Sequence, residues 1–188
     1  MRFSKNGRGM TTGYLTEKVI TENRITRDFY TRDVLDVAPD LIGKNLVISL
    51  NESFARYTLT DVEAYRGHED KACHASKGKT PRTSVMFGEG GHLYVYLVYG
   101  MYWMLNIVTA GEGNPQAVLI RGLAGISGPG RVTKKLSVDL SFYGEDLVTS
   151  GRIWLEDTGI VPAYKTGPRV GIDYAGEYWK SVPWRYYL

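Results

Sequence analysis

Cysteine and histidine are scarce in this 188-residue sequence, which restricts the metal and redox chemistry available to it. The single cysteine, Cys73, excludes an internal disulfide and any zinc site built on several cysteines. The three histidines, His68, His74 and His92, do not follow the helical spacing of metal-binding motifs. We therefore expect no protein metal site, and a reducing, cytoplasmic setting fits best.

Long hydrophobic runs are also missing. The one membrane-like stretch, residues 93–108, has no charge but is shorter than the roughly 20 residues of a membrane-spanning helix. Four tyrosines and Gly100 interrupt it, so a buried hairpin is the better interpretation. Residues 1–27 are polar and lack the apolar core of a signal peptide or anchor, and we expect them to form a flexible N-terminal arm.

The charge balance is nearly even, with 23 Lys and Arg against 20 Asp and Glu, a net charge of +3. Such a balance permits an anionic partner, nucleic acid included, without demanding one. Hydrophobic residues make up 43% of the chain and charged residues 23%, which is ordinary for a folded domain. The length suits one domain.

Turn residues and periodicity predict a single α+β domain over residues 28–188. Asp33 precedes an apolar segment and Gly43 follows it, as at the two ends of a capped helix. Segments rich in β-branched and aromatic residues predict strands. The expected helices cover residues 33–42 and 131–137, and the expected strands cover 45–50, 56–65, 93–98, 101–108 and 118–123. This order indicates a curved, mostly antiparallel sheet flanked by helices.

Glu63 is the first candidate for chemistry. Alternation along its strand places it on the same face as Leu59 and Tyr65. A carboxylate between apolar neighbours is poorly solvated and often serves as a general base, whereas a solvated glutamate at a strand end is the alternative. Arg121 stands in an apolar strand and needs a partner, for which Glu63 is a candidate. The sequence leaves this pairing and the role of His74 open.

The tyrosine-rich segment 93–103 is the second candidate. Tyr99 sits at the expected turn, where it has little core to fill, and it can act as a wedge in a DNA stack. The alternative is that these aromatics pack a core. Residues 125–131, which end in Gly130 and Arg131, resemble a phosphate cradle without a P-loop lysine. They either hold a DNA phosphate or form a plain helix-entry turn.

Read together, these segments resemble the alkyladenine (3-methyladenine) DNA glycosylase family. The first matches are APDLIGK at 38–44, VEAY at 62–65, EDKACH at 69–74, TPR at 80–82 and MF at 86–87. The next are LYVY at 93–96, YGMY at 99–102, NI at 106–107 and VLIR at 118–121. The last are SGP at 127–129, WLE at 154–156, RVG at 169–171 and AGE at 175–177. Their common order across about residues 28–186 is far more specific than any one motif.

The resemblance implies a domain with a protruding hairpin that enters the minor groove of double-stranded DNA. Tyr99 would fill the gap left by an extruded nucleotide. Arg82, Met101, Gly130 and Arg131 would make further contacts with the DNA.

The resemblance also implies a pocket for the extruded base, lined by Tyr65, Ala72, His74, Tyr96 and Asn106. Aromatic faces suit alkylated purines, because a positively charged ring gains a cation–π energy of roughly 0.5–2 kcal/mol. The backbone around Ala72 and His74 would read the base edge. Asn106 would crowd the 2-amino group of guanine and so reject the normal base.

Glu63, Arg121 and the carbonyl of Val170 would hold the attacking water. The implied activity belongs to base excision repair, as in a glycosylase of the DNA-3-methyladenine type II class. A monofunctional enzyme would hydrolyse the N-glycosidic bond of 3-methyladenine, 7-methylguanine, hypoxanthine or ethenoadenine and leave an abasic site. It would need no metal or cofactor. We expect a monomer in the cytoplasm, at the nucleoid, of a bacterium, or in the nucleus of a eukaryote, with no membrane partner.

Two other functions stay open. One is a non-catalytic nucleic-acid-binding module in which the tyrosines serve as stacking platforms. The other is a bifunctional glycosylase/lyase, which needs a Schiff-base lysine; Lys71 and Lys77 are nearby, but no motif singles them out. Compared with the family, the chain stops at Leu188 soon after the last match, and two extra residues lie in the loop of residues 109–116.

Overall fold

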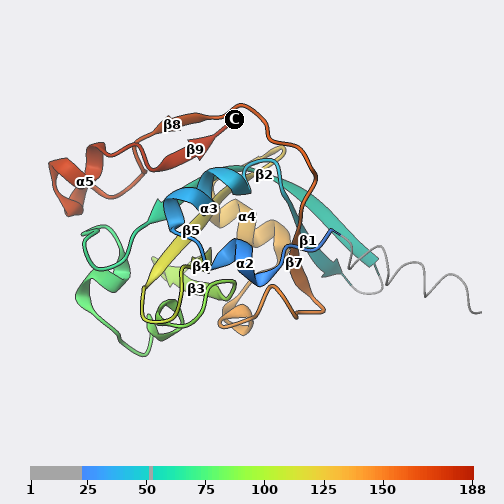
Figure 1. Ribbon diagram of the computed structural model, residues 1–188, viewed down its shortest axis with the longest axis horizontal. Helices are drawn as coiled ribbons and strands as arrows, with labels where there is room; N and C mark the ends of the chain where they lie inside the picture. Colours follow the sequence, from blue (N-terminus) through green and yellow to red (C-terminus); the bar gives the residue numbers. More distant parts are fainter. Residues whose placement is uncertain (1–22, 51–52) are drawn as a thin grey trace, which may run out of the picture.

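A curved antiparallel sheet runs through the centre of the molecule, with helices packed beside it (Figure 1). The structure is a computed structural model that describes residues 23–50 and 53–188. The longer strands are β1 (Asn45–Leu50), β2 (Ser53–Tyr65), β3 (Leu93–Val98), β4 (Tyr102–Thr109), β5 (Gln116–Leu123) and β7 (Ile153–Glu156). The short strands are β6 (Ile126–Ser127), β8 (Lys165–Gly167) and β9 (Arg185–Tyr187). The expected α+β class is confirmed.

The helices in the described residues are all short. The α-helices are α2 (Arg27–Tyr30), α3 (Val34–Leu41), α4 (Pro129–Leu136) and α5 (Glu177–Ser181). Single turns of 3-10 helix are η1 (His74–Lys77), η2 (Ser84–Phe87), η3 (Leu140–Phe142) and η4 (Asp173–Ala175). In the part of the chain that the structure describes, no helix has the length and apolar character needed to span a membrane.

Strand β2 joins the two parts of the sheet. Its first half pairs with β1, and its second half pairs with β5 on one edge and β9 on the other. The hydrogen-bonded order is β3-β4-β5-β2-β1-β7, and each of these pairs is antiparallel. Register shifts between Leu59 and Val62 bend the strand at this junction. These shifts interrupt the predicted alternation of side chains between the two faces of the strand after Leu59. Glu63 and Tyr65 follow the shifts, and their side chains share one face.

Helix α3 begins and ends where its sequence predicts. The Asp33 side chain accepts a hydrogen bond of 2.9 Å from the N–H of Leu35 and so caps the first turn. Gly43 follows the helix with φ +87°, a left-handed conformation that glycine adopts without a steric penalty. The expected helix at residues 33–42 is confirmed.

The hydrophobic core fixes the two strands that carry the candidate catalytic residues. Val34, Val37 and Leu41 of α3 are fully buried, as are Val132 and Leu136 of α4. Burial of each such aliphatic side chain contributes roughly 1.5–3 kcal/mol. Helix α3 packs on β2 and β5, and α4 packs on β4 and β5.

The expected strands are all present, although their ends differ. Strand β2 begins three residues earlier than expected, β5 begins two residues earlier, and β4 is displaced by one residue. Helix α4 begins two residues early because Pro129 occupies the first helical position, where its missing N–H is not needed. The expected turn at residues 51–53 lies mostly outside the described residues.

Residues 125–131 form a helix-entry turn. The first of them pair with β5 as strand β6, and Gly128 with φ +102° precedes α4. A Cβ on Gly130 would lie 2.8 Å from the ring of Tyr102, so the helix start packs closely on the β3–β4 hairpin beside its tip. The helix-entry interpretation is confirmed, and the phosphate contact stays a prediction.

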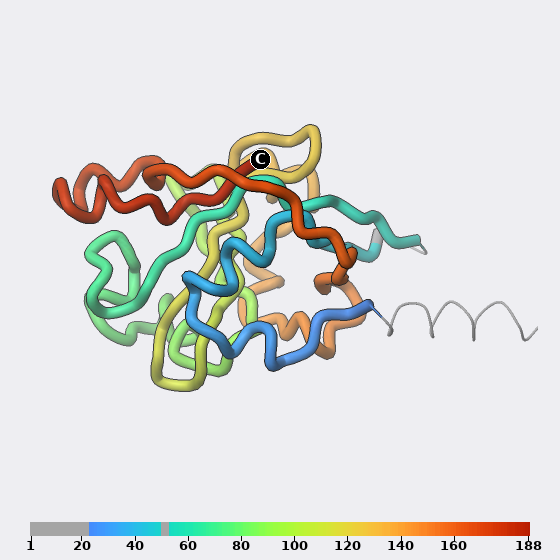
Figure 2. Tube along the Cα trace, turned by 45° about the horizontal axis from the view of Figure 1, so that its top comes forward, coloured from blue at the N-terminus to red at the C-terminus, as the bar shows by residue number. Residues whose placement is uncertain are grey.

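Both ends of the described chain pack on the sheet. The expected arm, residues 1–27, lies mostly outside the described residues, but Arg24 bridges to Glu156 and Ile25 is buried in the core. At the other end, β8, η4, α5 and β9 form a segment that we call the C-terminal flap, residues 165–188. The flap runs beside the loop that follows β2 in both views (Figures 1 and 2).

Candidate active site

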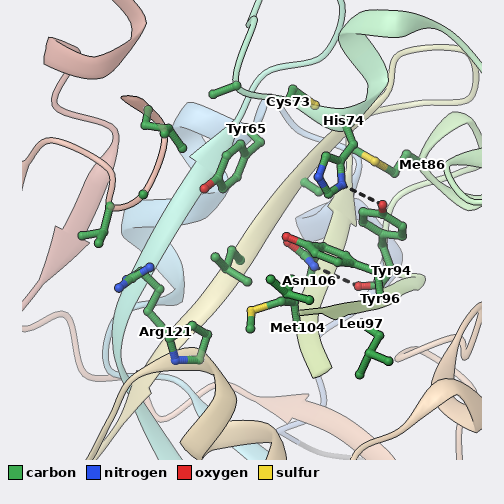
Figure 3. A pocket seen from close by; sticks show the side chains of 18 of the residues that line it. Tyr65, Cys73, His74, Met86, Tyr94, Tyr96, Leu97, Met104, Asn106 and Arg121 are labelled. Carbon is green, nitrogen blue, oxygen red and sulfur yellow. Dashed lines mark hydrogen bonds between the residues drawn. The ribbon is translucent and has the colours of Figure 1, made fainter. Parts of the chain in front are cut away.

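A cavity of about 470 Å³ lies between the sheet and the C-terminal flap (Figure 3). The volume falls within the roughly 300–1,000 Å³ of small-molecule sites in proteins. The predicted site residues that line it are Tyr65, Ala72, His74, Arg82, Tyr96, Tyr99, Asn106, Arg121 and Val170. The structure therefore brings all the predicted base-binding residues together. None of the lining residues comes from the loop of residues 110–115.

Glu63 lies directly behind this lining, with 0% of its surface exposed. The Val170 N–H donates to Glu63 Oε1 at 2.8 Å, and the Tyr65 hydroxyl donates to Oε2 at 2.9 Å. Nη1 of Arg121 lies 3.3 Å from Oε1. Three groups that line the cavity thus hold the carboxylate in one orientation, and the solvated strand-end alternative is wrong. The role predicted for the Val170 carbonyl stays a prediction.

Burial raises the pKa of Glu63 above its ordinary value, chiefly through loss of solvation. The Arg121 charge, the Val170 N–H and the Tyr65 hydroxyl act in the opposite direction and favour the ionised form. The neighbouring charge of Asp61 adds to the rise. A carboxylate with a raised pKa is a stronger base than one in water, as proton abstraction from a water molecule requires.

Arg121 lies against Glu63, so the pairing that the sequence left open is present. Its side chain is 13% exposed, and its Nε lies 3.9 Å from Asp61. Asp61 in turn accepts two hydrogen bonds, of 3.0 and 2.8 Å, from Arg185 of the flap. The negative charges of Glu63 and Asp61 are therefore balanced by the positive charges of Arg121 and Arg185 in a region with little solvent. Within residues 23–50 and 53–188, no three His, Cys, Asp or Glu side chains group as metal ligands do.

Aromatic rings form the walls of the cavity. Tyr65 comes from β2 and Tyr96 from β3, with β5 and β4 between them in the sheet. Tyr65 therefore stands across the cavity from Tyr96 and His74 (Figure 3). The rings of His74 and Tyr96 contact each other, with centroids 4.7 Å apart. Aromatic side chains therefore lie on both sides of the cavity.

His74 is neutral at ordinary pH. Burial lowers its pKa to about 4, and the charges of Arg82 and Lys77 act in the same direction. Its Nδ1 lies 2.8 Å from the hydroxyl oxygen of Tyr94, which fixes the ring. A neutral imidazole does not repel a positively charged ligand.

Backbone and amide groups complete the cavity. Asn106 is 3% exposed, and its Nδ2 donates to the Tyr94 carbonyl at 3.0 Å, which holds the amide at the lining. The N–H of Ala72 donates to Asp70, and its carbonyl accepts a hydrogen bond of 3.0 Å from Tyr174. The Ala72 carbonyl keeps a second lone pair for a ligand.

Tyr99 occupies the tip of the β3–β4 hairpin and is 86% exposed. It has φ +52° and Gly100 has φ +67°, and the Met101 N–H donates to the Val98 carbonyl. This is the geometry of a type I′ turn, which favours Asn-Gly. A bulky residue with positive φ is strained, and such strain persists mostly at functional sites.

The remaining predicted DNA contacts lie around this tip. Met101, Gly130 and Arg131 line a groove of about 600 Å³ between the hairpin and α4. Arg82 lies at the cavity itself, with its guanidinium 4.8 Å from the ring of Tyr96. The predicted DNA contacts therefore lie either in the cavity lining or in this groove, and both are bordered by the hairpin and the start of α4.

Several residues of the site are not predicted by the sequence. Asp61 lies two positions before Glu63, but the register shift between Asp61 and Val62 interrupts the alternation of the strand, so simple alternation does not predict that both acids approach Arg121. The buried pair Asp70 and Arg169 and the flap residue Tyr174 have no local signal, because contacts of about 100 positions in sequence separation join them.

Comparison with known proteins identifies the family. The family model for methylpurine-DNA glycosylase matches residues 28–127 and 124–188. A protein of Methanocella arvoryzae named "Putative 3-methyladenine DNA glycosylase" is 44% identical over 87% of this chain and 91% of its own length. Proteins of the same name are 42% identical in Desulfitobacterium hafniense, over 88% of this chain and 95% of theirs, and 46% identical in Wolbachia pipientis of Culex pipiens, over 83% and 87%. The chain belongs to the methylpurine-DNA glycosylase family.

Proposed function

We propose that the protein is a monofunctional DNA glycosylase that extrudes a damaged purine from duplex DNA and hydrolyses its bond to deoxyribose. The observation that carries this proposal is the buried Glu63, held behind the wall of an aromatic cavity that opens beside an exposed, strained tyrosine. Family membership and the names of the relatives support it. We further propose that it acts as a monomer.

The chemistry follows from the position of Glu63. Cleavage of a purine N-glycosidic bond passes through a cationic, oxocarbenium-like sugar. The Glu63 carboxylate takes a proton from the attacking water and stabilises the positive charge on the sugar. Because the carboxylate has no exposed surface, the water enters where Tyr65, Arg121 and Val170 meet the cavity, once the nucleotide is bound.

The cavity favours alkylated purines. A cationic base between Tyr65 and Tyr96 gains cation–π energy, and neutral His74 does not oppose it. Such a base is also a good leaving group without protonation. We propose 3-methyladenine and 7-methylguanine as the principal substrates and hypoxanthine and ethenoadenine, which leave as neutral bases, as slower ones. Asn106 crowds the 2-amino group of guanine and so rejects the normal base. 7-Methylguanine has the same 2-amino group, but its positive charge gains cation–π energy and makes it a better leaving group, which offsets the crowding.

Capture of the nucleotide depends on the hairpin tip. Tyr99 enters the base stack from the minor groove and occupies the place of the extruded nucleotide. Met101 contacts the neighbouring bases, while the start of α4 at Gly130 and Arg131 contacts phosphates. Extrusion costs least for a weakly paired lesion, so it adds to selectivity.

A bifunctional lyase is less well supported. Lys71 and Lys77 are exposed and do not line the cavity, so neither amine is placed to attack the sugar. A binding module without catalysis accounts for the tyrosines, but it leaves without a purpose a fully buried carboxylate beside the pocket that accepts two hydrogen bonds and pairs with Arg121.

The test is to incubate the protein with methylated duplex DNA and to identify the released bases by chromatography. The proposal expects free 3-methyladenine and 7-methylguanine, intact abasic strands, and no covalent adduct after borohydride reduction. A binding module retains the DNA and releases no base, which contradicts the proposal. A borohydride-trapped adduct overturns the monofunctional mechanism.

The pH dependence of base release provides a second prediction. The reaction needs ionised Glu63, so the rate on a 7-methylguanine duplex falls as the pH drops through the raised pKa of this group. With this cationic base we expect a plateau on the alkaline side. A hypoxanthine duplex adds an alkaline decline, because a neutral base must be protonated. A single-turnover rate on 7-methylguanine that rises toward acid contradicts the role of Glu63.

A further inference from the structure

Asp70 and Arg169 form a buried ion pair that joins the loop after β2 to the C-terminal flap. Both side chains are 0% exposed. Nη1 of Arg169 donates to one carboxylate oxygen of Asp70, and Nη2 donates to the other at 2.9 Å. Nη1 also donates to the Ala64 carbonyl at 2.9 Å. The guanidinium packs over the ring of Tyr65, 4.8 Å from its centroid.

The Asp70–Arg169 pair fixes one backbone segment on each side of the cavity, at Ala72 and at Val170. Asp70 accepts a hydrogen bond of 3.0 Å from the N–H of Ala72, in the wall that we expect to read the base edge. Arg169 directly precedes Val170, whose N–H donates to Glu63 at 2.8 Å. Neither charged side chain touches the cavity or the carboxylate of Glu63.

A buried ion pair is weak evidence of stabilisation, because the loss of hydration offsets much of the attraction between the charges. A role other than stabilisation is therefore the better explanation for this fully buried ion pair. Here the bidentate geometry fixes the backbone direction at residue 169, which a single-point ammonium contact does not do.

We propose that Asp70 and Arg169 are positioning residues that hold the Val170 amide against Glu63 and so keep this carboxylate ionised for catalysis. This inference rests on the proposed role of Glu63 as general base. The amide of Val170 is one of the groups that favour the charged form of Glu63. When the pair is loosened, the amide moves away, the pKa of Glu63 rises, and the carboxylate is protonated at a higher pH.

Other groups also act on Glu63 and must stay in place for the comparison to be valid. They are Asp61 and Tyr65 from β2, Tyr96 from β3, Arg121 from β5, Tyr174 from η4 and Arg185 from β9. The pair contacts the ring of one of them, Tyr65, and the variants below leave all six residues unchanged.

The main test variant is Arg169→Lys, which keeps the charge but loses the two-point contact. A second variant combines Asp70→Leu with Arg169→Met, because an apolar replacement of a buried pair often preserves folding. The control is Arg152→Lys, in an Arg–carboxylate pair with Glu145 that lies outside the cavity lining. Thermal unfolding verifies that each variant is folded.

The readout is the ionisation of Glu63 itself, followed by NMR of protein labelled with ¹³C-carboxyl glutamate and assigned by the signal missing in Glu63→Gln. We expect the titration midpoint to rise by about one unit in both test variants, which lowers base release about tenfold on the acid side. The control midpoint should not move. An unchanged midpoint in the folded double variant, or an equal shift in the control, overturns the inference. If the wild-type protein releases no base, the proposed function fails, yet the titration still decides the role of the pair.

Discussion

Replacement of Glu63 by Gln is expected to slow base release by about 10²–10⁴-fold, the contribution of a positioned general base. Glutamine has nearly the same shape: its amide oxygen still accepts from the Val170 N–H, and its NH2 group replaces the oxygen that faces Tyr65 and donates to that hydroxyl. It neither takes a proton from water nor offsets the charge of the sugar. The measurement is the single-turnover release of 7-methylguanine from a methylated duplex.

Binding must survive this change if Glu63 acts in the chemical step. We expect the Glu63→Gln protein to retain its affinity for lesion-containing duplex, measured at fixed salt because phosphate contacts depend on it. Glu112→Gln is the matched control, since Glu112 is exposed and does not line the cavity. Near-normal release by Glu63→Gln removes the residue from the role of base.

Replacement of Tyr99 by Ala is expected to weaken the capture of lesion DNA by about 1–3 kcal/mol, or roughly 5- to 150-fold, the value of one aromatic side chain stacked on bases. The side chain is 86% exposed in the free protein, so its truncation removes no core packing. The measurement is the affinity for duplexes with and without a lesion. Tyr164→Ala is the control, because Tyr164 is also exposed but does not line the cavity.

Two substitutions of Tyr99 distinguish its role in DNA capture from the effect of its strained backbone on stability. Tyr99 has φ +52°, a conformation that glycine adopts more easily than alanine by about 1 kcal/mol. Tyr99→Gly should therefore unfold at a higher temperature than Tyr99→Ala, while both capture lesion DNA equally poorly. Equal stability of the two variants shows that the turn is not strained, and normal capture removes Tyr99 from the wedge role.

Local signals in the sequence predicted much of the framework. The capping Asp33 and the left-handed Gly43 define the ends of α3, because both depend only on neighbouring backbone. The apolar run with Gly100 near its middle is a hairpin, as its tyrosines and its length indicated. The predicted strand ends were less accurate. Pairing with β1 extends the start of β2 to Ser53 regardless of residue type.

Contacts between distant segments were harder to predict. The partner of Arg121 stayed open because charge alone does not choose between Glu63 and any other acid. The flap was not foreseen as a unit, since β8 and β9 have only three residues each and depend on pairing with each other and with β2. The role of Asp70 is visible only when Arg169, 99 positions later, folds against it.

The most direct measurement is the structure of the protein bound to a duplex with a non-cleavable analogue of an alkylated purine nucleotide. We expect the damaged base between Tyr65 on one side and His74 and Tyr96 on the other, Tyr99 in the former place of the base in the stack, and one water molecule between Glu63 and the C1′ carbon. A base that remains stacked in the duplex, or a C1′ carbon farther from Glu63 than one water molecule can bridge, contradicts this expectation.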